Sequence, residues 1–373
     1  MRPAATRRRL SRLLGGFYVG RVTGEQAAGG RDSAPRDIGV GVWLVVVCVF
    51  VLAMILVGGA TRLTDSGLSI TEWDLGKGLT PPLSDARWSE EFALYQRTAE
   101  YQLQNSHMTQ DDFRQIYWWE WSHRFLGKVT GIVFALPFLF FLFTRRLKQR
   151  LLPVLGLFAM GGLQGAIGWW MVTSGLWSGV DVSPVRLAVH LAIAFAILAF
   201  ALSLALDAFA WPRAGGVLGA PKLTLYAFIA LLFVQIMLGA LLAGSDGGAR
   251  YADWPTIGGE WLPRTAFDGA SLDDLVHNHA TQHLLHRSNG YLVALLALLI
   301  AATAWRHGQG LAKRAAMALG GLTLAQAALG VATVLMVSPL HASLTHQFGA
   351  ALLWMAAFIA LRCVTVANYR NTN

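Results

Sequence analysis

Four histidines recur at matched positions along this chain. His123 and His286 each open a copy of the pattern H-R-x-x-G, one in each half of the sequence. His190 and His346 form a second couple, which follows the first at a similar distance in segments that are otherwise apolar. Two neutral imidazoles that face each other across a helical bundle can bind the iron of one haem from both sides. The spacing therefore predicts two haem sites, one with metal ligands His123 and His190 and the other with His286 and His346.

The composition indicates that lipid surrounds much of the chain. Hydrophobic residues make up 55% of the 373 residues and charged residues only 14%, against about 25% in soluble domains. Histidine is costly inside a membrane span, so its presence there favours a functional role. The net charge of +9 does not indicate a nucleic-acid partner, because the charges sort by loop. The two cysteines, Cys48 and Cys363, provide neither a disulfide framework nor a thiolate metal site.

The apolar runs predict the elements that must position these histidines. A helix that crosses a bilayer needs about 20 apolar residues. The last charge-free run is too long for one span and is interrupted at residues 338–340, since Pro339 lacks the amide donor of a helix interior. The sequence thus predicts an all-α integral membrane protein with eight transmembrane helices. The runs cover residues 38–61, 129–144, 151–180, 187–206, 223–245, 288–305 and 315–361. We expect the second and sixth helices to begin earlier, with Arg124, Lys128 and Arg287 reaching the interface.

Lysine and arginine orient the spans, because they collect in cytoplasmic loops. With the N-terminus inside, the inner segments hold 19 Lys and Arg against 4 Asp and Glu, and the outer segments hold 11 against 17. Eight spans then return the C-terminus to the cytoplasm as well. We expect a multi-pass protein of a bacterial inner membrane, and a mitochondrial inner membrane is the less favoured alternative.

The chain is organised as two similar halves of four helices each, residues 38–210 and 222–363. Because each half has an even number of helices, both have the same orientation. The repeat therefore predicts tandem four-helix bundles related by a pseudo-twofold axis along the membrane normal. The remaining segments are a basic cytoplasmic N-terminal segment, a cytoplasmic linker and a cytoplasmic tail: residues 1–37, 211–221 and 364–373.

Two long outer loops, residues 61–122 and 244–285, precede the H-R-x-x-G segments. In the first loop, the stretch 84–119 has few helix breakers and is expected to form amphipathic helices on the bundle. In the second, the i, i+4 spacing of His279 and His283, with His277 nearby, is compatible with a zinc or copper site. A solvated loop is the favoured interpretation of these three histidines.

Charged residues beside the ligands suggest further roles. Arg124 and Arg287 directly follow the first histidine of each pair, where a guanidinium could hold haem propionates. Glu120 lies three residues before His123 and falls on the same helix face if the helix extends back. The corresponding residue in the second half is His283, so the asymmetry suggests that the first half performs the chemistry. The alternative is that Glu120 is a solvated loop residue.

Several segments together resemble the haem A synthase family, in its mitochondrial and alphaproteobacterial branch. The resemblance covers roughly residues 38–363, and the second half matches more loosely, through His286-Arg287 and Thr345-His346-Gln347. Many bacterial members carry a cysteine pair in the first outer loop, and this chain has none there. The most specific segments are GGATRLTDSGLS at 58–69, TEW at 71–73, GLTPPL at 78–83 and WWEWSHRFLG at 118–127.

The resemblance implies oxidation of the C8 methyl group of haem O to a formyl group, for cytochrome oxidase biogenesis. It implies that His123 and His190 hold the substrate haem, that His286 and His346 hold a permanent haem b, and that Glu120 is catalytic. Oxygen insertion and attack by water both remain open. Haem O synthase, an electron carrier and cytochrome oxidase assembly factors are the expected protein partners, with membrane lipids around the chain, and a homo-oligomer is compatible with the sequence.

Two other functions fit parts of the pattern. A di-haem cytochrome would carry electrons across the bilayer, but such a conduit needs haems near opposite faces, and all four histidines are expected near the outer face. A transporter with a parallel repeat would place polar features near the midplane. Gln164, Gln235 and Gln326 are weak candidates for these.

Overall fold

The computed structural model describes residues 36–72, 80–176, 179–212, 216–267 and 274–371. Most of the basic segment expected at 1–37 lies outside these ranges. Within them the chain is helical and has no β-strand, apart from one isolated bridge between Ile257 and Glu260. The long helices are α1 (Ile38–Leu63), α4 (Gln110–Phe143), α5 (Leu151–Leu176), α6 (Pro184–Ala208), α7 (Lys222–Gly244), α9 (His279–His307), α10 (Gly310–Leu335) and α11 (Leu340–Asn371).

These eight helices, among the described residues, are long and apolar enough to cross a membrane. The prediction of an all-helical chain with eight candidate membrane spans is therefore confirmed. The second and sixth spans begin well before their charge-free runs, at Gln110 and His279. The predicted interruption near Pro339 is also found, because α10 ends at Leu335 and α11 begins at Leu340.

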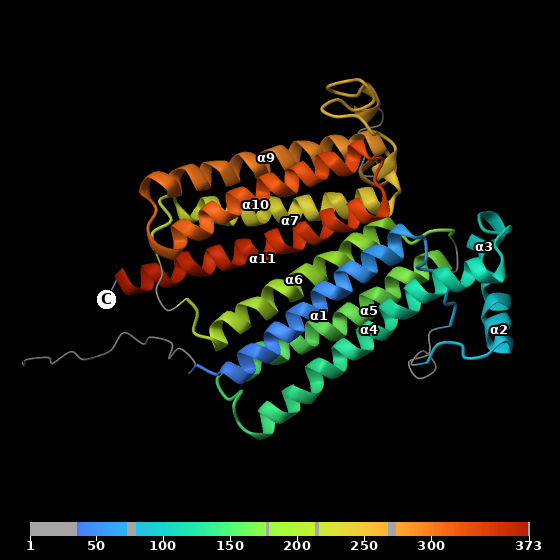
Figure 1. Cartoon of the computed structure of the whole chain (residues 1–373), viewed down its shortest axis with the longest axis horizontal. Coiled ribbons are helices and arrows are strands. Elements are labelled where there is room, and N and C mark those ends of the chain that lie inside the picture. Colours follow the sequence, from blue (N-terminus) through green and yellow to red (C-terminus); the bar gives the residue numbers. More distant parts are fainter. Residues whose placement is uncertain (1–35, 73–79, 177–178, 213–215, 268–273, 372–373) are drawn as a thin grey trace, which may run out of the picture. The chain divides into compact units, whose positions relative to one another are not determined.

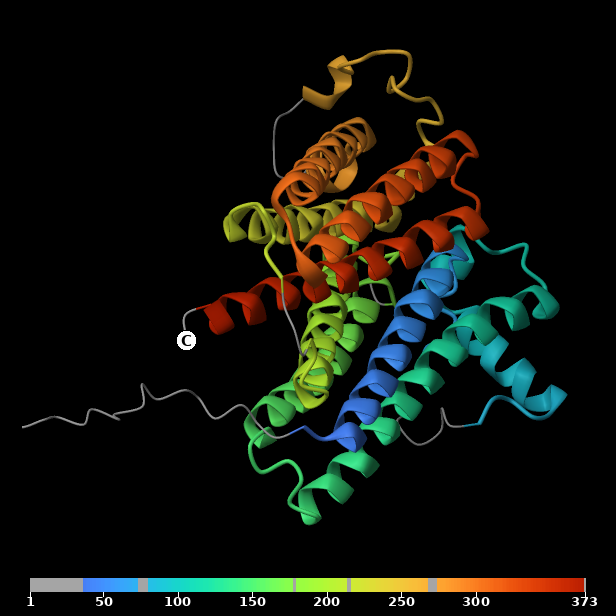
Figure 2. The same cartoon turned by 60° about the vertical axis from the view of Figure 1, so that its left-hand side comes forward.

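The helices lie in two groups of four in Figure 1, with α1, α4, α5 and α6 on one side and α7, α9, α10 and α11 on the other. Figure 2 shows the same division from a second direction. Helix α6 packs against both α1 and α7, and α1 also contacts α11, so the groups share one apolar core. Trp354 of α11 lies in this core and donates a hydrogen bond from its indole N–H to the carbonyl of Phe195 at 2.9 Å.

The first long loop forms a small helical layer on the start of α4. Helices α2 (Asp85–Tyr95) and α3 (Ala99–Leu103) occupy the stretch expected to be amphipathic. Buried aromatic side chains join this layer to α4: Trp88, Tyr95, Phe113 and Tyr117. A capping box between Thr109 and Asp112 starts α4 inside the layer, since each side chain satisfies a backbone amide of the other. The extension of α4 is thus fixed by its cap and by aromatic packing.

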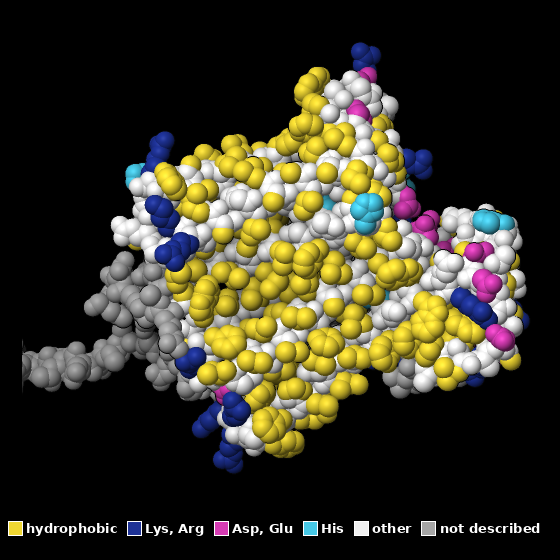
Figure 3. Space-filling model, in the orientation of Figure 1, with side chains coloured by type: hydrophobic (Ala, Val, Ile, Leu, Met, Phe, Trp, Pro, Cys, Tyr) yellow, Lys and Arg dark blue, Asp and Glu magenta, His cyan; other side chains and the backbone are white. Residues whose placement is uncertain are grey.

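The second loop contains short helical turns beside α9. They are η2 (Gly247–Ala249), η3 (Arg264–Phe267) and α8 (Asp274–His277). Figure 3 shows apolar side chains over the flank of the helices on the visible face. Lys and Arg gather at one end there, and most of the visible Asp and Glu lie at the opposite end with the loops. Apolar flanks between charged ends are what a bilayer-spanning bundle requires.

Candidate haem-binding site

The four predicted ligands line one large cavity at the loop-bearing end of the helices. His123 comes from α4, His190 from α6, His286 from α9 and His346 from α11. The cavity has a volume of about 1110 Å³ and reaches into both groups of helices, whereas ligand pockets typically measure about 300–1,000 Å³. The structure therefore brings all four predicted ligands to one cavity.

A glycine on a neighbouring helix packs against each histidine. A Cβ atom on any of these glycines would approach the imidazole ring to about the closest distance that real contacts allow. The distances from that Cβ to the nearest ring atom are 2.9 Å for Gly58 and His123, 3.0 Å for Gly168 and His190, 3.1 Å for Gly239 and His286, and 2.9 Å for Gly330 and His346. The four glycines thus hold the rings against the helix backbones and leave the cavity side open.

A glutamine side chain orients three of the four rings. Its amide nitrogen lies 3.2 Å from His190 for Gln164, 3.2 Å from His286 for Gln235 and 3.1 Å from His346 for Gln326. The sequence suggested these glutamines only as weak transporter residues, and their contact with the histidines was missed. Hydrogen bonds to a ligand ring fix its orientation, as around metal-binding histidines.

His123 has a different neighbour. Gly58 packs on His123 as Gly239 packs on His286, and Met54 precedes Gly58 at the position where Gln235 precedes Gly239. Met54 lines the cavity, and its thioether cannot donate a hydrogen bond to an imidazole. His123 is therefore held by packing where the other three rings are held by an amide.

Glu120 is buried, with 3% of its surface exposed, and it faces the same cavity as His123. Its carboxylate accepts hydrogen bonds from the Ser69 hydroxyl at 2.8 Å and the Ile70 amide at 2.8 Å. It also accepts one from the Arg124 guanidinium at 2.6 Å. The alternative of a solvated loop glutamate is therefore wrong: Glu120 fastens the loop to α4 and places its carboxylate on the cavity wall.

Arg124 and Arg287 fasten the two long loops in the same manner. Arg124 donates to the carbonyls of Ile70 at 2.9 Å and Glu72 at 3.2 Å. Arg287 donates to the carbonyls of Tyr251, Asp253 and Thr256 at 3.1, 2.9 and 2.6 Å. Each guanidinium thus holds a loop over the cavity and adds positive charge to its rim.

His283 takes the place of Glu120 in the second half. It is 1% exposed, and its ring lies 2.9 Å from the Gly247 carbonyl and 3.2 Å from Arg287. His279 instead contacts Gln282 at 3.1 Å. Across the described parts of the chain, no converging group of metal-ligating side chains includes these histidines. The solvated-loop interpretation is wrong for His283, and a zinc or copper site gains no support.

Glu100 is a buried acid that the sequence did not single out. It lies on α3, lines the cavity and is 3% exposed, and its Oε2 atom has no hydrogen-bond partner. Burial raises the pKa of Glu100 to about 8, and nearby Glu120, Asp181 and Asp65 act in the same direction. Its position in a short polar segment gave no signal, because its burial depends on how α3 packs against α5.

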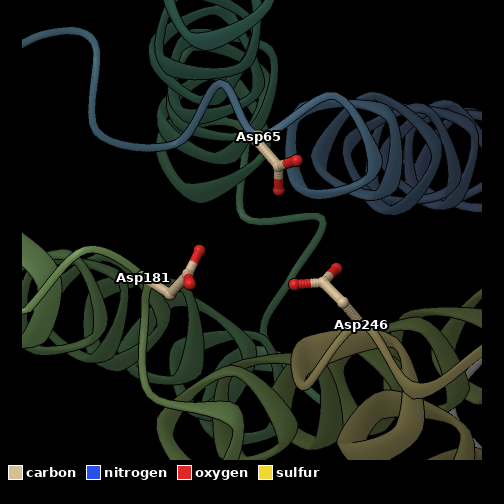
Figure 4. A group of neighbouring side chains, drawn as sticks. All are labelled: Asp65, Asp181 and Asp246. Atoms are coloured by element: carbon tan, nitrogen blue, oxygen red, sulfur yellow. The ribbon is translucent and has the colours of Figure 1, made fainter. Parts of the chain in front are cut away.

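Three aspartates from separate loops converge at the rim of the cavity. Figure 4 shows the carboxylates of Asp65, Asp181 and Asp246 facing one another, and their oxygen atoms lie within 4.8 Å. The Arg62 guanidinium binds Asp65 at 2.6 Å and Asp246 at 2.8 Å. Arg62 also donates to the Gly244 carbonyl at 3.1 Å, so this cluster ties the end of α1 to the end of α7.

Comparison with known proteins identifies the family. Residues 41–358 match the family model described as cytochrome oxidase assembly protein. A protein named Heme A synthase from Maricaulis maris is 46% identical over 333 residues, which cover 88% of this chain and 96% of the relative. Its namesake from Paracoccus denitrificans is 46% identical over 322 residues, covering 84% of each chain. The chain therefore belongs to the cytochrome oxidase assembly protein family that includes these haem A synthases.

Proposed function

We propose that this protein is a haem A synthase that oxidises the C8 methyl group of haem O to a formyl group, for the assembly of cytochrome oxidase. Family membership over most of the chain supports this. One observation links the proposed function to particular residues: the four histidines line a shared cavity at one end of the bundle. The chain would act with a source of haem O, an electron carrier and assembly factors of the oxidase.

We assign the substrate haem to His123 and His190, and a resident haem b to His286 and His346. The residues fit such groups, because the cavity is large, each ring has a glycine behind it, and the buried Nδ1 of His190 has no partner. Glu120 distinguishes the two pairs, since it puts a carboxylate beside the first and His283 puts an imidazole ring beside the second.

The arrangement in the membrane follows from the same assignment. We propose that the halves are tandem four-helix bundles related by a pseudo-twofold axis along the membrane normal, with both termini cytoplasmic and the histidines near the outer face of a bacterial inner membrane. The similar intervals between matched residues and the charge difference between inner and outer segments support this.

The reaction removes four electrons from the methyl carbon. With water as the oxygen source it balances as R–CH3 + H2O → R–CHO + 4 e− + 4 H+. When bound, haem b would supply an iron that accepts and passes on single electrons. Glu120 would accept a proton near the reacting carbon, and Arg124 and Arg287 would place positive charge near the propionates. His123, which lacks a glutamine partner, is the ligand we expect to be least firmly oriented.

Haem content of ligand variants tests the assignment. The full chain would be purified after coexpression with a haem O source, and its haems extracted and separated. We expect His190→Ala to lose haem O and haem A but keep haem b, and His346→Ala to lose haem b. Loss of haem b from His190→Ala alone would reverse the assignment of the two pairs.

A further inference from the structure

The helix pair beside each histidine site packs differently in the two halves. The backbones of α9 and α10 approach each other closely, whereas those of α4 and α5 do so at only a few positions. The residues at matching positions account for this difference. His123 and His286 set the correspondence between α4 and α9, and Gln164 and Gln326 set that between α5 and α10.

Small residues bring α9 and α10 together. Ala297 and Ala304 of α9 are fully buried, and a Cβ on Gly320 of α10 would lie 2.8 Å from the Cβ of Ala301. Small residues allow the backbones of membrane helices to approach closely. The second half is thus closed between α9 and α10 at the level of Gly320, although the neighbouring Ala294, Thr323 and Ala327 still line the cavity.

Phenylalanines separate α4 and α5 at the corresponding positions. Phe134 and Phe138 take the places of Ala297 and Ala301, and Phe158 takes the place of Gly320. Phe158 stacks on Phe134 with a centroid distance of 5.7 Å and on Phe138 with 6.2 Å. The layer of stacked rings lies between the two helices and prevents the close approach seen in the second half.

Four glycines leave open space between this phenylalanine layer and the histidines. They are Gly131 of α4 and Gly161, Gly162 and Gly165 of α5; all line the cavity, and a Cβ on any of them would meet no atom within 4 Å. The matching positions in the second half carry larger residues: Ala294, Thr323, Leu324 and Ala327. The cavity of the first half therefore continues as an apolar slot between α4 and α5.

We propose that this slot receives the isoprenoid chain of the substrate haem and is the lateral route by which haem O enters and haem A leaves. This inference rests on the proposed function. Gly161 and Gly162 lie near the middle of α5 and are exposed, at a depth where lipid would surround a hydrocarbon chain. The slot also continues the space beside His123 and His190. Haem O carries a long isoprenoid chain and haem b does not. The half with the slot would thus exchange its haem, and the closed half would retain its own.

Filling the slot tests the proposal. Gly162→Leu would be purified as the full chain after coexpression with a haem O source, and haem O plus haem A would be measured per mole of protein. We expect a fall of about tenfold with unchanged haem b. The matched control is Gly321→Leu on α10, where a Cβ also meets no atom within 4 Å but the residue does not line the cavity. Gly321→Leu should bind as much haem O and haem A per mole of protein as the wild type.

Two further arms make each outcome decisive. In the first, haem b, which lacks the isoprenoid chain, is added to the wild type and to Gly162→Leu after the His286–His346 site has been filled. Gly162→Leu should bind this second haem b at the first site as well as the wild type does. If Gly162→Leu also loses resident haem b, Gly162→Ala replaces it and should show a smaller, selective fall. Wild-type content of haem O in the filled variant would overturn the slot. A wild type that binds haem O but forms no haem A would refute the proposed function and leave the slot standing.

Discussion

Replacing Glu120 by glutamine should loosen the first loop and stall the reaction while haem stays bound. The carboxylate accepts from Ser69, Ile70 and Arg124 at 2.8, 2.8 and 2.6 Å. A glutamine has one acceptor oxygen, so its amide nitrogen must face either the Ile70 N–H or the guanidinium. One hydrogen bond that involves a charged group is therefore lost, and the closed loop is destabilised by about 1.5–3 kcal/mol. A loss of about 2 kcal/mol raises the open fraction of the loop roughly 30-fold.

Amide hydrogen exchange around Ile70 measures that change directly, because the affected donor is the amide itself. We expect exchange about 30-fold faster in Glu120→Gln, together with a lower haem A yield at unchanged total haem. His283→Ala is the matched control for the loop contact, since it weakens the equivalent contact with Arg287 and should leave exchange around Ile70 unchanged. Unchanged exchange with an unchanged haem A yield would refute the reasoning about Glu120.

Two other residues give predictions about stability and haem binding. Burial raises the pKa of Glu100 from its ordinary 4.5 to about 8, so the folded state retains a proton that the unfolded chain has lost between these values. The free energy of unfolding should then fall by up to about 1.4 kcal/mol per pH unit across that range. Glu100→Gln should make the melting temperature less dependent on pH there. Glu90→Gln, at an exposed position, should leave that pH dependence unchanged. A Cβ on Gly330 would lie 2.9 Å from His346, so Gly330→Val should displace that ring and lower haem b content, which an unchanged reduced-minus-oxidised spectrum would disprove.

The number of helices and the four histidines that line the cavity were predictable because they depend on local patterns. Apolar length predicted eight spans, proline predicted the break before Leu340, and the repeated H-R-x-x-G predicted matched ligands. The residue at which α4 begins was harder to predict from the sequence, because it depends on the cap at Thr109 and on aromatic packing with α2.

The surroundings of the ligands needed the three-dimensional structure. Loop carbonyls take the donors of Arg124 and Arg287, and no local pattern shows where a long loop folds back. The burial of Glu100 depends in the same way on packing between distant segments. The glutamine contacts could have been predicted from the sequence, because Gln164 and Gln326 recur at the same interval as Gly168 and Gly330. Their role was missed because the rings they contact lie on other helices.

Haem A formation at the first histidine pair is the central claim, and one measurement tests it directly. The full chain and its His123→Ala variant are coexpressed with a haem O source in a host that makes no haem A, and the haems extracted from the whole cells are separated by chromatography. The account predicts a formyl haem from the wild type and only haem O and haem b from the variant. A wild type that yields no formyl haem, or a variant that yields as much as the wild type, would contradict it.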